Sequence, residues 1–212
     1  MARDRRRGPP RPRRTPQQQI RQILVFVEGE RTEDGYFKHW GRQHRSEVIV
    51  NIHEFNGAAP LSLVERAVAE QKRERYEANH GRGQSHDEIW CVFDVDSHPK
   101  LPEAIQLAAT HNIKVAISNP CFELWFILHY EDQTAHIERH PAQARSKELI
   151  KCKKILTTKA LEGLADRYQD AVKRAKALDK KHEDDGSPPR SNPSSEVWKL
   201  VERIRKSTSL KV

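Results

Sequence analysis

The sequence predicts an α/β fold with a mostly parallel, doubly wound sheet flanked by helices. Strand-length runs of apolar or β-branched residues recur along the first part of the chain, at residues 23–27, 47–55, 88–95 and 113–117. Helix-length segments separate these runs, and alternation at such short spacing is typical of α/β proteins. The first run is apolar throughout, as expected for a strand that helices cover on both faces.

Local signals predict the elements of the first half. A helix is expected from Thr32 to about His44, because Thr32 can cap it and an aromatic stripe lies within it at helical spacing. A turn at 56–60 follows the second strand. It leads into an amphipathic helix predicted over 61–77.

The second half of the predicted sheet continues the same alternation. The strand at 88–95 leads into a helix over 102–111 and a short strand at 113–117. The segment "SNPCFELWFILHYED" is a predicted helix start. Asn119 can cap this helix, and Pro120 suits the first helical position because its missing N–H is not needed there.

The chain changes character after Asp132. No further strand is predicted, and charged, amphipathic helices are expected across 133–212, the last of them over 195–207. The pattern S-N-P-x-x-E occurs twice, at 118–123 and 191–196. Both copies predict helix starts, because a glutamate in the first turn is stabilised by the positive end of the helix dipole.

The net charge of +8 on this 212-residue chain is concentrated at its amino end. Residues 1–20 hold seven arginines, four prolines and a single acid, Asp4. Such a segment cannot bury enough apolar surface to offset its ordering entropy, so a disordered tail is predicted over 1–21. A basic arm attracts nucleic acid through charge and counterion release; the alternative is a solubilising tail without a partner. The candidate nucleic-acid contacts are Arg5, Arg6, Arg7, Arg11, Arg13 and Arg14.

Three regions are therefore expected: the tail, an α/β core over 22–132 and a helical C-terminal region over 133–212. No apolar run approaches the ~20 residues that span a membrane, and no apolar stretch follows the arginines as in a signal peptide. The three cysteines lack C-x-x-C spacing, so they do not suggest a zinc motif. We expect a cytoplasmic protein with no membrane partner.

Acidic residues stand at the ends of two predicted strands. Glu28 ends the first strand and precedes a glycine, and Asp94 and Asp96 end the third. Sites in open parallel sheets form beyond the carboxyl ends of the strands, and residues two apart on a strand share a face. Carboxylates this close repel one another unless a cation lies between them, and oxygen ligands suit Mg²⁺ or Mn²⁺. The alternative is that these acids are helix caps or loop residues.

These segments resemble known families. "VEGERTEDGYF" with "FDVDS" is similar to the Toprim domain of topoisomerases, primases and overcoming-lysogenization-defect (OLD) nucleases. Together with "SNPCFELWFILHYED" and "NPSSEVWKLVERI", the set resembles the RloB family over about residues 22–206. The resemblance implies a Toprim-like α/β fold in which Glu28, Asp94 and Asp96 are the catalytic and metal-binding residues.

Two further acids match the resemblance in less defined roles. Glu123 matches the "FE" of the RloB pattern, either as another metal ligand or as a helix-dipole acid. Glu33 matches the "TE" after the glycine, either as a first-turn acid or as a partner of the ligands.

RloB proteins are small bacterial proteins often met beside restriction and phage-defence genes. The resemblance thus implies a metal-dependent nuclease that hydrolyses DNA or RNA in antiviral defence, with nucleic acid and a defence-system protein as partners. The alternative is a nucleic-acid-binding or regulatory subunit without turnover, because a fold does not determine a function. A haloacid-dehalogenase-type phosphatase fits poorly, since its D-x-D lies on the first strand. A response-regulator receiver needs a strand-ending lysine and fits poorly too.

Overall fold

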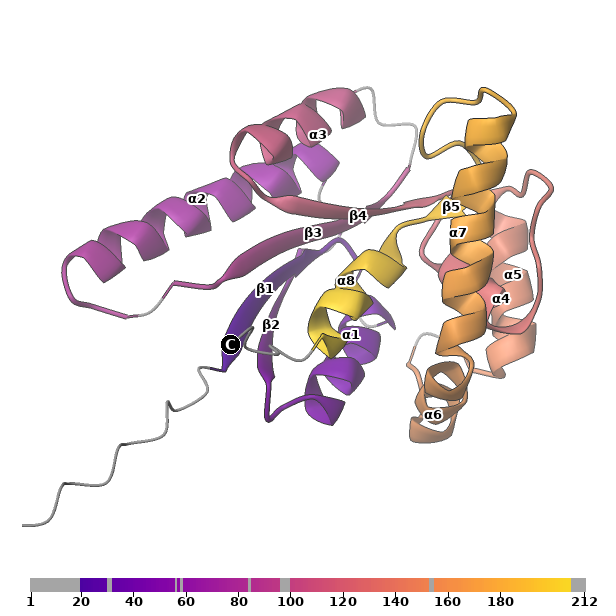
Figure 1. Cartoon of the computed structure of the whole chain (residues 1–212), viewed down its shortest axis with the longest axis horizontal. Coiled ribbons are helices and arrows are strands. Elements are labelled where there is room, and N and C mark those ends of the chain that lie inside the picture. Colours follow the sequence, from indigo (N-terminus) through magenta and orange to yellow (C-terminus); the bar gives the residue numbers. More distant parts are fainter. Residues whose placement is uncertain are drawn as a thin grey trace, which may run out of the picture.

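A computed structural model describes residues 20–29, 32–55, 57, 59–83, 85–95, 100–152 and 155–206 of the chain. Its sheet has five strands in the order β2-β1-β3-β4-β5, the first four parallel and β5 antiparallel to β4 (Figure 1). The strands are β1 (Arg21–Val27), β2 (Val48–Glu54), β3 (Glu88–Asp94), β4 (Lys114–Asn119) and β5 (Ser194–Ser195). The predicted α/β class with a mostly parallel sheet is confirmed.

Helices cover both faces of this sheet. α2 and α3 pack on one face, and α1, α4 and α8 pack on the other, with α5 and α7 lying against α4 (Figure 1). The helices are α1 (Thr32–Gln43), α2 (Pro60–Asn79), α3 (Leu101–Thr110), α4 (Glu123–Tyr130), α5 (Arg139–Ile150), α6 (Thr158–Asp166), α7 (Tyr168–Asp184) and α8 (Val197–Arg205). Among the described residues, no helix combines the length and the apolar character needed to cross a membrane.

β1 shows why a continuous apolar run was the right signal for a central strand. Ile23 and Val25 join the core formed with α1 and α4, whereas Leu24 and Phe26 join the core formed with α2 and α3. Successive side chains of a strand point to opposite faces, so a strand covered on both sides must be apolar at every position.

The chain changes sheet face between β1 and β3. α1 connects β1 to β2 on one face, and α2 connects β2 to β3 across β1 on the other. Crevices at such a switch point, beyond the carboxyl ends of the strands, are where open α/β sheets bind ligands. The register pairs Val27 with Val92 and Asp94 with Ser118, so β1, β3 and β4 end at the same edge of the sheet.

The helix start predicted at Asn119 and Pro120 is wrong. β4 continues to Asn119, and α4 begins only at Glu123. The Asn119 side chain does not cap the helix; its Nδ2 donates a hydrogen bond of 2.8 Å to the backbone carbonyl of Arg190, the residue before the distant second S-N-P segment. A long-range partner has thus replaced the local cap that the sequence suggested.

The prediction that no strand follows Asp132 is also wrong. Ser194 and Ser195 form the short strand β5, which pairs antiparallel with Asn119 and Ser118. The hydroxyls of Ser118 and Ser195 lie 3.1 Å apart. The two S-N-P-x-x-E segments are therefore neighbours in space, and a two-residue polar strand carries none of the apolar alternation that predicts strands.

The C-terminal helices share a core with the sheet. Leu178 of α7 and Leu200 and Ile204 of α8 belong to the same buried cluster as Ile23 of β1 and Trp125 of α4. Arg203 of α8 also reaches β3, where its Nε donates to Glu88 at 2.8 Å. The end of the described chain is thereby held against the centre of the fold.

Candidate functional site

Four carboxylates meet one arginine at the carboxyl edge of the sheet. We call this group the acidic site; its members are Glu28, Glu33, Asp94, Glu123 and Arg139. The charges of the other three acids and of the arginine all act on Asp94, and the charges of two acids and the arginine act on Glu33. Four separate elements of the fold therefore deliver acids to one location.

The sheet itself positions two of these acids. The backbone N–H of Glu28 donates to the carbonyl of Val92 at 3.3 Å, which extends the pairing of β1 with β3 one residue past β1. Asp94 is the last residue of β3 and is buried, with 8% of its surface exposed. The backbone N–H of Val95 donates to the Ser118 carbonyl at 2.7 Å and holds the chain just after Asp94.

Glu33 lies in the first turn of α1, directly against Gly29. A Cβ atom at position 29 would lie 2.0 Å from Oε2 and 2.2 Å from Oε1 of Glu33. The glycine after Glu28 thus leaves room for the Glu33 carboxylate, and no unusual backbone angle is involved. Any side chain at position 29 would displace the Glu33 carboxylate.

A buried aromatic cluster ties α4, which carries Glu123, to α1, which carries Glu33. Trp125 Nε1 donates a hydrogen bond of 2.8 Å to the hydroxyl of Tyr36. Phe122 packs edge-on against Tyr36, with ring centroids 6.0 Å apart. Offset and edge-on aromatic pairs add to the stability of a core, so these contacts make the spacing of the two helix starts rigid.

His129 completes this cluster as a neutral packing residue. Its Nδ1 lies 2.7 Å from the Trp125 carbonyl, and its Nε2 lies 3.5 Å from the Tyr36 hydroxyl. Burial lowers the pKa of His129 to about 3, because the charged imidazolium would lose its hydration. Both Trp125 and His129 are buried, as packing residues are.

Arg139, the first residue of α5, is the member of the site that sequence reasoning missed. Its Nη2 donates to Oδ2 of Asp94 at 2.9 Å. The two residues are 45 positions apart, and Arg139 lies in a charged stretch without strand or motif signals. Nothing in the local sequence separates it from its neighbours, so only the packing of α5 against α4 reveals it.

The electrostatics of the site disfavour negative charge. Burial, and then the charge of Glu33, raises the pKa of Asp94 well above its usual range, and Arg139 only partly offsets this. Burial likewise raises the pKa of Glu33 to about 7; Glu123 and Glu28 add to the effect, whereas its own backbone N–H and Arg139 oppose it. An additional cation at this location would relieve both carboxylates.

The chemistry of the donors fits a hard divalent cation. Carboxylate oxygens are the ligands that Mg²⁺ and Mn²⁺ prefer. Within the described part of the chain, however, no group of three or more His, Cys, Asp or Glu side chains is arranged so that it could hold a metal ion as it stands. The acids therefore have oxygen donors of the right kind, but the carboxylates that the structure describes are not arranged around a common metal position.

The sequence-predicted site residues have different outcomes. Glu28, Asp94 and Glu123 are brought together, and Glu33 joins them. Asp96 lies outside the described residues, as do the six arginines predicted to contact nucleic acid: Arg5, Arg6, Arg7, Arg11, Arg13 and Arg14. Glu123 is both the first residue of α4 and a neighbour of Asp94 in the acidic site, a position that is compatible with either of its two predicted roles.

The fold and the site together define an α/β protein whose four neighbouring acids, neutralised in part by one arginine, lie at the carboxyl edge of a mostly parallel sheet. The family model described as RloB-like protein matches residues 23–204, from β1 into α8. The chain belongs to this RloB-like family. No curated protein and no solved structure matches it.

Proposed function

We propose that this protein is a divalent-metal-dependent nuclease that hydrolyses phosphodiester bonds of DNA or RNA in antiviral defence. The observation that carries the proposal is the convergence of Glu28, Glu33, Asp94 and Glu123 at the switch point of the sheet. The pKa values of Asp94 and Glu33 are raised by burial and by the charges of the neighbouring acids, and such perturbed carboxylates are candidates for a functional site.

The resemblance to Toprim sites supports the same proposal. An acid followed by glycine comes directly after β1, and the first aspartate of the D-x-D motif ends β3. Asp94, Asp96, Glu28 and Glu123 would hold Mg²⁺ or Mn²⁺. Such an ion clamps phosphoryl oxygens and makes bound water a better nucleophile.

The chain's own groups have distinct tasks in this proposal. Glu28 orients the attacking water or accepts its proton, because it lies directly after β1 and beside β3 at the carboxyl edge of the sheet. Arg139 contacts the scissile phosphate, since a guanidinium donates several hydrogen bonds in a plane that matches phosphate oxygens. The ion pair between Arg139 and Asp94 holds that guanidinium within the site before substrate binds.

A non-catalytic nucleic-acid-binding or regulatory subunit is the second candidate. Two observations favour it: the described acids do not close around a metal position, and Arg139 already pairs with Asp94. In that case Arg139 would neutralise the site permanently, and the fold would serve for binding alone.

Cleavage assays separate the two candidates. Labelled single and double strands of DNA and RNA are incubated with the full chain in Mg²⁺, Mn²⁺ or EDTA. Asp94→Asn is compared with Asp132→Asn, which removes the charge of an exposed aspartate paired with Arg174 away from the acidic site. We expect cleavage that needs the metal and falls at least about 100-fold in Asp94→Asn alone.

Metal binding and phage restriction complete the test. Calorimetric titration with Mn²⁺ reports the metal site without any substrate, and plaque counts on cells expressing each variant report defence. Full cleavage by Asp94→Asn in EDTA would overturn the metal-dependent mechanism. Polynucleotide binding without cleavage in any metal would leave the regulatory subunit as the better account.

A further inference from the structure

The second half of α2 extends beyond the body of the protein. Leu63, Val64, Ala67 and Val68 anchor its first half in the core, but after Val68 only Glu74 is buried. At about 1.5 Å per residue, the helix of 20 residues is about 30 Å long. Figure 1 shows its end projecting past the amino ends of the strands, at the opposite edge of the sheet from the acidic site.

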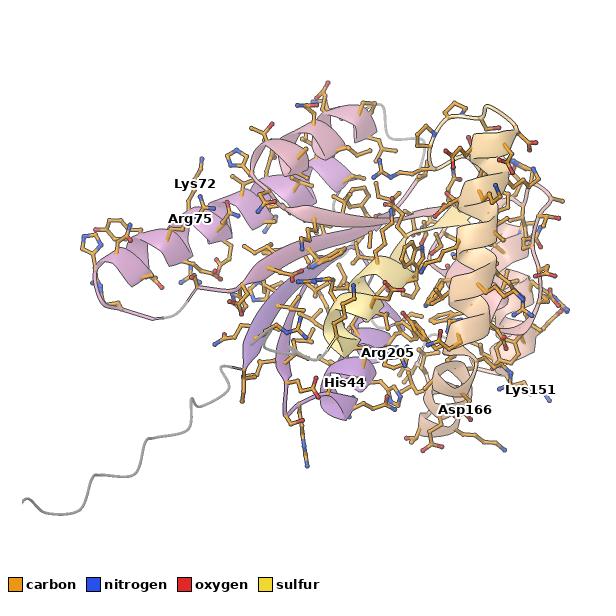
Figure 2. All side chains as sticks on the ribbon, in the orientation of Figure 1. His44, Lys72, Arg75, Lys151, Asp166 and Arg205 are labelled. Atoms are coloured by element: carbon orange, nitrogen blue, oxygen red, sulfur yellow. The ribbon has the colours of Figure 1, made fainter. Side chains whose placement is uncertain are left out.

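One face of this projecting half carries cations and aromatic rings. We call it the basic face of α2 and define it by Lys72, Arg75, Tyr76 and His80, which are all exposed. Tyr76 exposes 58% of its surface, which is unusual for a large hydrophobic residue of this protein. Its ring lies against that of His80, with centroids 4.2 Å apart. Lys72 points away from the sheet in Figure 2.

The acids of the same half-helix are occupied elsewhere. Arg73 pairs with Glu70 and Glu77 on another side of α2. The Glu74 carboxylate accepts a hydrogen bond of 2.6 Å from His86 Nδ1 and is buried. Neither Lys72 nor Arg75 forms an ion pair with a described residue, so the charges of both side chains remain available to a ligand.

A cavity lies beside the basic face of α2, and its three cations differ in whether an acid pairs with them. Arg75 borders a polar cavity of about 380 Å³ at the amino edge of the sheet, together with Lys114 and Arg203. Both of those other cations are bound by Glu88. Arg75 is thus the one of these three cations that has no ion pair with a described residue, although Glu74 and Asp87 also line the cavity.

We propose that the basic face of α2 binds a polynucleotide strand, with Lys72 and Arg75 on phosphates and Tyr76 stacked on a base. Exposed cations interleaved with a stacking ring are the features that hold single strands independently of sequence. A purely acidic protein partner would use the cations but gain nothing from stacking. The identity of this polynucleotide as a substrate rests on the proposed function, whereas its binding does not.

Binding of the full chain to a labelled single-stranded oligonucleotide is measured by fluorescence anisotropy in EDTA, across a salt series. Replacing Lys72 and Arg75 together by alanine removes two phosphate contacts, so the slope of log K against log salt should flatten by about 1.4. Tyr76→Ala should weaken binding of the single strand about fivefold or more. The matched control is Arg73→Ala, which removes one cation of α2 that is already paired with Glu70 and Glu77.

The outcomes separate this inference from the nuclease proposal. An unchanged salt slope in Lys72→Ala/Arg75→Ala, or an equal loss per charge in Arg73→Ala, would overturn the basic face as a binding surface. Competition by polyglutamate that is equally sensitive to Tyr76→Ala would overturn a base-stacking partner. If oligonucleotide binding depends on Lys72, Arg75 and Tyr76 but the protein cleaves no nucleic acid, the binding surface on α2 is upheld and the nuclease proposal is rejected. Thermal melting checks that each variant folds.

Discussion

The strand β3 carries a carboxylate at each end, and the two ends have opposite electrostatics. At its amino end, Glu88 accepts hydrogen bonds from Arg203 Nε at 2.8 Å, Lys114 Nζ at 2.9 Å and Trp90 Nε1 at 3.0 Å. At its carboxyl end, Asp94 has the hydrogen bond from Arg139 but also faces the charges of the other acids of the acidic site.

The pKa values follow this difference in partners. Burial by itself raises the pKa of Glu88, but the hydrogen bonds from Arg203, Lys114 and Trp90 outweigh it and lower the pKa to about 2. Burial and like charges leave the pKa of Asp94 well above its usual range. At the amino end of β3, Glu88 thus joins α8 to the sheet. At the carboxyl end, the acids repel one another, and a bound cation would reduce this repulsion.

Glu33→Gln should have the largest effect on stability, because it removes a negative charge from the carboxyl end of β3, where the acids repel one another. The pKa of Glu33 is raised from 4.5 to about 7, so the folded protein is destabilised as pH rises through this window, and the full penalty is present above pH 7. We expect Glu33→Gln to stabilise the metal-free protein by up to about 3 kcal/mol at pH 8 and to change little at pH 4. Urea denaturation in EDTA at several pH values measures this. A variant whose stability parallels wild type at every pH would contradict the assignment.

Glu88→Gln should destabilise the protein, because it removes the ion pairs at the amino end of β3. The pH dependence of this effect is opposite to that of Glu33→Gln. Because the pKa of Glu88 falls from 4.5 to about 2, its contribution is present above pH 4.5 and lost as pH falls toward 2. Lys114 and Arg203 are 40% and 38% exposed, so screening limits the loss at pH 7 to about 2 kcal/mol. Urea denaturation compares it with Glu131→Gln, whose carboxylate pairs with Arg145 at the surface. Equal losses of stability in both variants would show that the Glu88 ion pairs stabilise the fold no more than an ion pair at the surface does.

Glu123→Gln should sharpen the comparison, because stability and metal affinity are expected to move apart. Loss of a first-turn acid costs a few tenths to about 1 kcal/mol, but relief of repulsion with Asp94 and Glu33 offsets it. We expect stability within about 1 kcal/mol of wild type and Mn²⁺ affinity lowered about tenfold. Calorimetry and melting temperature are measured on the same sample. Unaltered metal affinity with a small loss of stability would leave Glu123 a helix-start residue only.

Gly29→Ala should have the smallest effect on stability and a selective effect on the site. The methyl group displaces the end of a flexible side chain, Glu33, so the cost should stay below about 1 kcal/mol. We expect Gly29→Ala and Glu33→Gln to weaken metal binding alike, because both change the carboxylate next to the proposed ligands, and the double variant should bind metal no worse than Glu33→Gln. Gly35→Ala is the control, because no atom lies within 4 Å of the added carbon. Additive losses in the double variant would show that Gly29 acts independently of Glu33.

The alternation of strands and helices was predictable because it depends on near neighbours in the chain. The apolar run of β1 and the stripe of α1 report burial directly. The positions of Glu28 and Asp94 then followed from topology, because parallel strands of one sheet end at the same edge. The failures have the opposite origin: Asn119 resembled a cap, but its partner is the Arg190 carbonyl, 71 residues away.

The sequence by itself determined which segments form the parallel sheet and which acids stand at its strand ends, because periodicity and strand direction are local properties. Only the tertiary structure decided that Arg139 pairs with Asp94, that Glu33 rests on Gly29, and that Ser194–Ser195 closes the sheet beside β4. Each of these contacts depends on how separate elements pack. The free energy of burying a charge is settled by every group around it, and most of those groups lie far away in the chain.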